Sequence, residues 1–165
     1  VQDALGERRD VIVISWTLMS LDDYRTRVEE RIGVAIDPRR LSSPASVAFA
    51  EQALERGHAV FVDGQIGGVV RELPTYPHGI LFRVLPRGSA LPPIGEVFAI
   101  NKALFEKFQF GYPIPTADPE LYSTYVHSEY ARTWAIIAKA LAATGNREDY
   151  TYALDMARAL GPQAP

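Results

Sequence analysis

The chain has 165 residues and a formal net charge of −3, with 17 lysines and arginines against 20 aspartates and glutamates. Its length suits one domain that buries about two thirds of its unfolded surface, and its slight acidity offers no broad basic field for a nucleic-acid partner. The lack of cysteine excludes disulfides and thiolate metal sites, and no apolar stretch reaches the roughly 18 residues that span a bilayer.

The first predicted element is a strand over residues 10–15, Asp-Val-Ile-Val-Ile-Ser. Its β-branched side chains form an unbroken run, which is typical of a strand buried on both faces of an α/β sheet. A second run, His-Ala-Val-Phe-Val-Asp, follows at residues 58–63. Because a long helical connection separates the two runs, we expect parallel strands joined by a right-handed crossover.

Two helices are predicted between these strands. Ser20 supplies a capping signal for an amphipathic helix over residues 21–32, which Gly33 ends. A second helix begins at Ser43 and runs to Gly57. Charges of alternating sign surround the apolar face of the first helix, so we interpret them as a solvated face and not as an acid pair.

The second strand leads into a glycine-rich loop over residues 63–68. Backbone amides in such a turn can hold an anion, and open parallel sheets bind ligands at the carboxyl ends of their strands. We therefore expect a candidate site for a nucleotide or sugar phosphate there. Its residues are Ser15, Trp16, Asp63, Gly64, Gln65, Gly67 and Gly68. The glycine spacing matches neither the dinucleotide fingerprint nor the P-loop, which leaves a plain turn as the alternative.

The middle of the chain combines a turn, a strand and a helix. A turn is predicted at residues 75–79, a third strand at 80–85 and a helix at 96–108. Residues 110–115, Phe-Gly-Tyr-Pro-Ile-Pro, cannot form a regular helix and predict an ordered aromatic loop. Such a loop serves as a partner site or packs against the core, and we favour packing because large exposed apolar patches are uncommon.

The chain ends in a predicted helical hairpin, with helices at about 118–144 and 147–160 joined by a turn at Gly145. It resembles a single tetratricopeptide-type unit, and since such repeats need about three copies to be stable, we expect the hairpin to pack on the rest of the chain. The predicted fold is α/β, a small, mostly parallel sheet of about three strands flanked by helices. An α/β domain at 1–117 and the hairpin at 118–165 would form one compact unit.

No catalytic constellation is visible in the sequence. The three histidines, His58, His78 and His127, are far apart, and none has the spacing of a metal ligand pair. Ser15 does not stand in a nucleophile elbow. We therefore assign no catalytic residue, no metal site and no cofactor.

Several segments resemble a family of multi-spanning membrane proteins, described as a domain of unknown function or as protein O-mannosyltransferase-like glycosyltransferases of the GT-C class. Residues 2–15 are similar to its Q-x-x-x-G-x-R-x-D-V-x-V-x-x-x-x-L segment. Residues 58–62 and 77–86 are similar to its P-V-Y-F strand and its x-x-G-L-x-Y-R-L-x-P segment. One departure is that the family has a Trp-Tyr pair after the first strand, where this chain has Asp23 and Tyr24.

The resemblance implies a noncatalytic, soluble, extracytoplasmic domain that follows the membrane-embedded part of a longer chain, and the start at Val1 instead of a methionine fits such a fragment. The family's catalytic acids would lie upstream. The implied partners are the membrane domain of the same parent chain and a glycan or protein acceptor, with no nucleic acid.

Two alternatives remain open. The first is a small-molecule-binding domain at the strand ends. The second is a protein-interaction module that uses the hairpin, supported by three tyrosines on its long helix and by the loop at Tyr112 and Pro113 ahead of it. The three tyrosines are Tyr122, Tyr125 and Tyr130.

Overall fold

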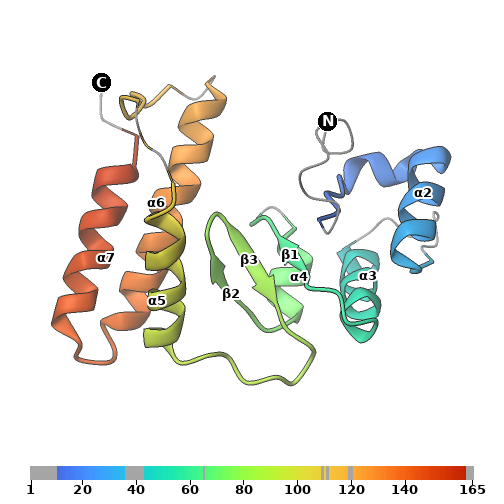
Figure 1. Cartoon of the computed structure of the whole chain (residues 1–165), viewed down its shortest axis with the longest axis horizontal. Helices are drawn as coiled ribbons and strands as arrows, with labels where there is room; N and C mark the ends of the chain where they lie inside the picture. Colours follow the sequence, from blue (N-terminus) through green and yellow to red (C-terminus); the bar gives the residue numbers. More distant parts are fainter. Residues whose placement is uncertain are drawn as a thin grey trace.

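A computed structural model describes residues 11–35, 43–64, 66–108, 110, 112–118 and 121–162, without the side chains of 43 and 44. Figure 1 shows a small sheet in the middle of the chain, with helices α2 and α3 toward the N-terminus and the group α5, α6 and α7 on the other side. Four predicted features lie outside the described part: residues 2–10, the cap at Ser43, Gln65 and Gly111.

The N-terminal helices follow the prediction closely. A short 3-10 helix η1 (Thr17–Ser20) precedes α2 (Asp22–Ile32), and α3 is Ser43–Glu55. Gly33 ends α2 in the left-handed conformation, with φ 72°, as its position predicts. The predicted cap is wrong, because Ser20 donates its hydroxyl to the Thr17 carbonyl and the residue before α2 makes no side-chain capping bond.

The predicted first strand is absent from residues 11–15, which have an irregular backbone. Ile12 and Ile14 pack on a cluster that includes Met19, Val28 and Val34. No described strand pairs with this segment, and its apolar side chains pack on a cluster to which η1, α2 and α3 contribute. The expected parallel pair and its right-handed crossover are therefore wrong.

The sheet is antiparallel, which corrects the prediction of a mostly parallel sheet. Its strands β1 (Phe61–Val62), β2 (Thr75–His78) and β3 (Leu81–Val84) lie in the order β1-β3-β2. Both neighbours of β3 run antiparallel to it, with Phe61 and Tyr76 opposite Arg83. The predicted turn at 75–79 is mostly strand β2, and such a short connection to β3 joins only antiparallel strands. A mixed helix and sheet fold is confirmed.

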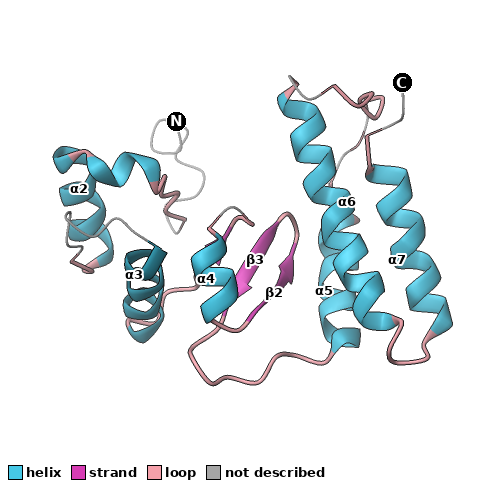
Figure 2. Ribbon diagram, turned by 180° about the vertical axis from the view of Figure 1, so that it is seen from behind, coloured by secondary structure: helices cyan, strands magenta, loops and turns pink. Residues whose placement is uncertain are grey.

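The glycine-rich loop runs into a helix that the sequence did not predict. Helix α4 is Gly67–Glu72, so both adjacent glycines belong to its first turn. Figure 2 shows α4 beside the sheet, on the side of α3. Val69 of α4, Val47 and Ala50 of α3 and Val84 of β3 form one buried cluster with Leu73. This cluster covers one face of the sheet.

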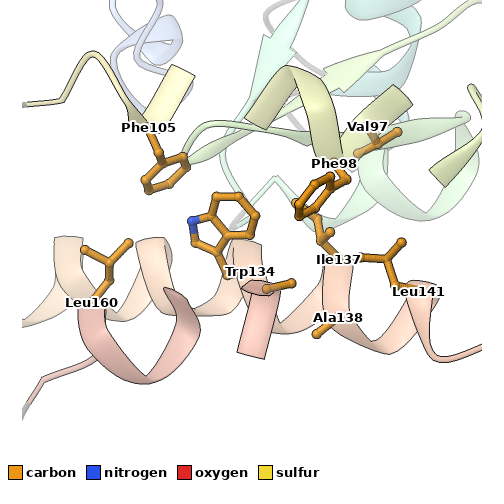
Figure 3. Packing of buried hydrophobic residues seen from close by; sticks show 9 residues of the cluster. Val97, Phe98, Phe105, Trp134, Ile137, Ala138, Leu141 and Leu160 are labelled. Atoms are coloured by element: carbon orange, nitrogen blue, oxygen red, sulfur yellow. The ribbon is translucent and has the colours of Figure 1, made fainter. Parts of the chain in front are cut away.

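The largest core lies between the C-terminal helices α5 (Ile94–Phe105), α6 (Tyr122–Leu141) and α7 (Arg147–Leu160). Figure 3 shows Trp134 of α6 between Phe98 and Phe105 of α5. The predicted hairpin is present as α6 and α7, and Asn146 caps α7 by accepting the Asp149 backbone N–H. None of the described helices is long and apolar enough to cross a membrane.

Candidate functional site

The residues predicted to bind a ligand fall into two separate places. Ser15 donates its backbone N–H to the Tyr24 hydroxyl at 2.9 Å, and the Trp16 ring packs against Phe49 with centroids 6.0 Å apart. Trp16, Tyr24 and Phe49 all pack on the apolar cluster that contains Val28 of α2 and Ala53 of α3. The other candidates follow β1, so the antiparallel sheet removes the shared edge on which the predicted site depended.

The structure keeps Asp63, Gly64, Gly67 and Gly68 together at the end of β1 and the start of α4. The Asp63 carboxylate accepts the backbone N–H of Ile66 at 3.2 Å. A loop amide that an anion would need is therefore already bonded to a carboxylate, which also repels anions. Gln65 lies outside the described residues, and anion binding at this loop stays a prediction.

An arginine that sequence reasoning missed lies against this loop. The Arg132 guanidinium comes from α6 and lies so close to Gly64 that a Cβ there would be 2.6 Å from Nη1. The same guanidinium is 3.4 Å from Glu129 and lies over the Phe82 ring, 6.0 Å from its centroid. Gly64 thus leaves room for a contact between α6 and the sheet. No short sequence motif signals such a long-range contact.

A second mixed cluster lies on the sheet itself. Phe61, His78 and Arg83 share one face, because Phe61 is directly opposite Arg83 and alternate residues point the same way. The Arg83 guanidinium lies 4.8 Å from the Phe61 centroid, and the His78 ring lies 5.1 Å from it. The pKa of His78 is below its ordinary value, mainly because burial disfavours the imidazolium and secondly because Arg83 repels it, although a backbone hydrogen bond acts in the opposite direction.

His127 is a fully buried histidine near the start of α6. Its Nδ1 lies 2.8 Å from the Leu160 carbonyl oxygen, and its Nε2 lies 3.2 Å from the Tyr112 hydroxyl. Since a carbonyl only accepts, Nδ1 carries the proton and Nε2 accepts from Tyr112. Phe110 and Tyr130 surround the imidazole. His127 therefore joins the aromatic loop to both helices of the hairpin as a satisfied core residue.

Four exposed apolar and aromatic side chains lie on the loop before α6 and on the first turns of that helix. We define the aromatic end as Tyr112, Leu121, Tyr122 and Tyr125, which are all exposed. Tyr122 is 78% exposed and contacts Tyr125, with ring centroids 5.9 Å apart and planes inclined by 32°. At about 200 Å² for each tyrosine, the contacting pair Tyr122 and Tyr125 exposes about 230 Å² of side chain.

The loop at the aromatic end is held against α6 by hydrogen bonds. The Thr124 hydroxyl donates to the Thr116 carbonyl at 3.2 Å, and the Asp118 backbone N–H lies 3.4 Å from the same hydroxyl oxygen. Together with the bond between Tyr112 and His127, these contacts hold the described residues Tyr112, Thr116 and Asp118 on α6. The aromatic end is thus a preorganised surface, which lowers the entropy lost on binding.

Other candidate sites are weaker. In the part of the chain that the structure describes, no three His, Asp or Glu side chains gather in a way that could hold a metal ion. A wide, open depression at the start of α2 is lined by its first turns and by η1. The residues around it are Leu18, Leu21, Asp22, Asp23, Tyr24 and Arg27.

No family model matches the sequence, and comparison with curated proteins and with solved structures finds no match either.

Proposed function

We propose that this chain is a noncatalytic binding domain that contacts a protein partner through the aromatic end. The observation that carries the proposal is the exposure of Tyr122 and Tyr125 in mutual contact on the first turns of α6. Tyrosine is enriched among residues that dominate binding energy, because it combines a large apolar ring with a hydroxyl and few rotatable bonds. The contact between the two rings also stabilises the first turns of α6, so it holds both tyrosines in one arrangement before a partner binds.

The composition of the aromatic end favours one class of partner surface. Its four residues carry no charge, so electrostatic complementarity would select neither an anionic nor a cationic partner. Hydroxyls on large apolar rings, as at Tyr122 and Tyr125, suit a protein surface with apolar side chains and exposed carbonyl groups. The resemblance to the membrane glycosyltransferase-like family makes the membrane domain of the same parent chain the partner that we propose. In that case the chain is its soluble extracytoplasmic domain.

The test begins with the parent reading frame, which should encode several apolar spans upstream of Val1. The membrane part, ended before Val1 and held in a lipid nanodisc, is then titrated with the present chain. We expect Tyr122→Ala with Tyr125→Ala to weaken the affinity at least tenfold, because an interface tyrosine contributes about 2 kcal/mol or more. Leu91→Ala is the control, since Leu91 is 55% exposed but lies in the loop before α5.

Three results would overturn the proposal: a parent frame without upstream spans, no binding by the wild-type chain, or equal binding by the tyrosine variant and the wild type. A glycan acceptor is the alternative occupant of the same surface. Binding of a soluble mannose oligosaccharide that depends on Tyr122, without binding of the membrane part, would replace the protein partner by that glycan.

A further inference from the structure

Arg83 is the middle member of a row of three side chains that crosses the sheet. It lies on the central strand β3, directly opposite Phe61 of β1 on one side and Tyr76 of β2 on the other. The neighbouring residues Val62 and Val84 point to the opposite face, where they pack in the cluster formed with α3 and α4. Arg83 therefore lies on the face of the sheet that α3 and α4 do not cover.

The Arg83 guanidinium has no acidic partner among the described residues. In that part of the chain it forms neither an ion pair nor a hydrogen bond, whereas Arg25 and Arg87 each bind a carboxylate. Arg83 is nevertheless half-buried, and its guanidinium lies 4.8 Å from the centroid of the Phe61 ring. Such a ring contact occupies the flat face of a guanidinium and leaves the N–H donors at its edge available. Since burial makes an unpaired charge costly, these donors indicate an anionic ligand.

The charge of this cluster suits a monoanion. The His78 ring lies 5.1 Å from the Phe61 ring, and the lowered pKa of His78, caused mainly by burial, keeps the imidazole neutral at pH 7. Arg83 thus supplies the single positive charge. A carboxylate carries one negative charge, and its two coplanar oxygens accept two parallel N–H bonds from a guanidinium. A phosphate monoester carries nearly two charges at pH 7 and would need a second cation beside Arg83.

The surface around Arg83 is apolar and small. Phe61 is 39% exposed, and Leu81 lies directly opposite His78 on the same face. Three strands about 4.8 Å apart give this face a width of about 10 Å, and the length of β3 adds about 13 Å in the other direction. A stable protein interface needs about 800 Å² on each side, so the size of this face suits a small molecule and not a protein.

We propose that this face of the sheet binds a small organic monocarboxylic acid, whose carboxylate pairs with Arg83 and whose apolar carbons pack on Phe61 and Leu81. The carboxylate accepts hydrogen bonds from the edge of the guanidinium, and the apolar group removes the exposed Phe61 ring from water. No residue of the aromatic end takes part, so this site is independent of the function proposed above.

Two probes of nearly equal shape, phenylacetate and phenylacetamide, test the need for a carboxylate. The isotope-labelled chain is titrated with each probe, and the backbone amide signals of β1 and β3 are followed by NMR. We expect phenylacetate to bind with a Kd of about 5 mM or tighter. The neutral amide should bind roughly tenfold more weakly or worse, because it lacks the charge that pairs with Arg83. Equal affinities of the two probes, or no shift with about 20 mM phenylacetate, would overturn the proposal.

Substitutions then locate the site. Arg83→Gln should weaken phenylacetate binding roughly tenfold or more, whereas Arg71→Gln, which removes an exposed arginine of α4, should leave the affinity unchanged. Phe61→Ala keeps the charge but removes the ring, and it should weaken binding roughly threefold or more. Circular dichroism and thermal unfolding establish that each variant is folded. An unchanged affinity in a folded Arg83→Gln or Phe61→Ala variant would contradict the site.

Two further probes distinguish other anions from a free carboxylic acid. Phenyl phosphate and a capped glutamate–phenylalanine dipeptide are titrated in the same way. Both should bind more weakly than phenylacetate, the first because the cluster has one positive charge and the second because its backbone extends beyond the small face. Tighter binding of either probe would overturn the assignment and replace the free acid by a phosphate ester or an acidic peptide.

Discussion

The Asn101 side chain bonds both sides of the turn between β2 and β3. Its Oδ1 accepts the Gly79 backbone N–H at 2.8 Å, and its Nδ2 donates to the Pro77 carbonyl at 2.8 Å. The second Nδ2 hydrogen goes to the Val97 carbonyl in the same helix, and the Thr133 hydroxyl donates to the Gly79 carbonyl at 2.7 Å. One buried amide from α5 and one hydroxyl from α6 therefore fix the sheet to the C-terminal helices.

Replacing this amide should be costly. Asn101→Leu leaves the buried Gly79 N–H and Pro77 carbonyl without partners, and each loss costs about 1–3 kcal/mol. We expect the free energy of unfolding, measured by urea titration, to fall by about 2–4 kcal/mol. Thr144→Ala is the control, because the Thr144 hydroxyl bonds the Leu141 carbonyl at a helix end. Equal losses of unfolding free energy in the two variants would show that the buried Asn101 bonds contribute no more than the bond at the helix end.

Two glycines should respond to alanine in opposite directions. Gly79 has φ +67°, a left-handed conformation that costs about 1–2 kcal/mol with any Cβ, so Gly79→Ala should destabilise the protein by that amount. Gly95 lies in α5 with no atom near an added Cβ, so Gly95→Ala should stabilise it by about 0.5 kcal/mol through helix propensity. Thermal midpoints of both variants check the signs. Two shifts of the same sign would contradict the expected difference between a left-handed and a helical glycine.

The hydrogen bonds of His127 should contribute more together than the Tyr112 bond alone. His127→Phe keeps an aromatic ring but leaves the Leu160 carbonyl without its imidazole donor, so we expect a loss of about 2 kcal/mol. Tyr112→Phe removes only the hydroxyl that bonds Nε2 and should cost about 1 kcal/mol. Urea unfolding of the single and double variants measures both values. Additive losses would mean that the two bonds are not coupled.

Stability should decrease as the pH is lowered, because of His78. The pKa of His78 is lowered in the folded state, chiefly by burial and further by Arg83, so the unfolded chain takes up a proton first. The contribution of neutral His78 to the free energy of unfolding is therefore fully present above the unfolded pKa of about 6.5. It decreases as the pH falls below that value. His78→Phe should remove this part of the decrease, and Arg83→Gln should reduce it. Unfolding free energies at a series of pH values compare the three chains, and parallel profiles would contradict the prediction.

The hairpin should be necessary for cooperative folding. Deleting residues 118–165 removes Trp134, Ile137 and Leu141 and exposes Phe98 and Phe105 of α5. At about 25 cal/mol per Å² of apolar surface, the loss is several kcal/mol against a total stability of about 5–15 kcal/mol. We expect aggregation or noncooperative unfolding, whereas Ile137→Ala should only lower the unfolding free energy by about 2–5 kcal/mol. A monomeric truncated chain with an unchanged thermal midpoint would make the hairpin a separable arm.

The exposure of the tyrosines on α6 could not be predicted from the sequence. Tyr122, Tyr125 and Tyr130 look equivalent in the sequence, but Tyr130 packs on Phe105 while Tyr122 is the most exposed of the three. Which face of a helix is covered depends on elements that are distant along the chain. The contact of Arg132 with Gly64 depends on such elements too, and neither residue signals it.

Local chemistry determined the longer helices, though not α4, because periodicity, glycine and capping residues act within a few positions. Gly33 ends α2 and Asn146 begins α7 for reasons contained in their own neighbourhoods. Tertiary structure alone decided the sheet. The β-branched run at residues 11–15 favours an extended backbone, but a strand forms only where another strand supplies hydrogen bonds. Residues 75–78 contain a proline and read as a turn, yet they pair with β3 because that short connection folds them back onto it.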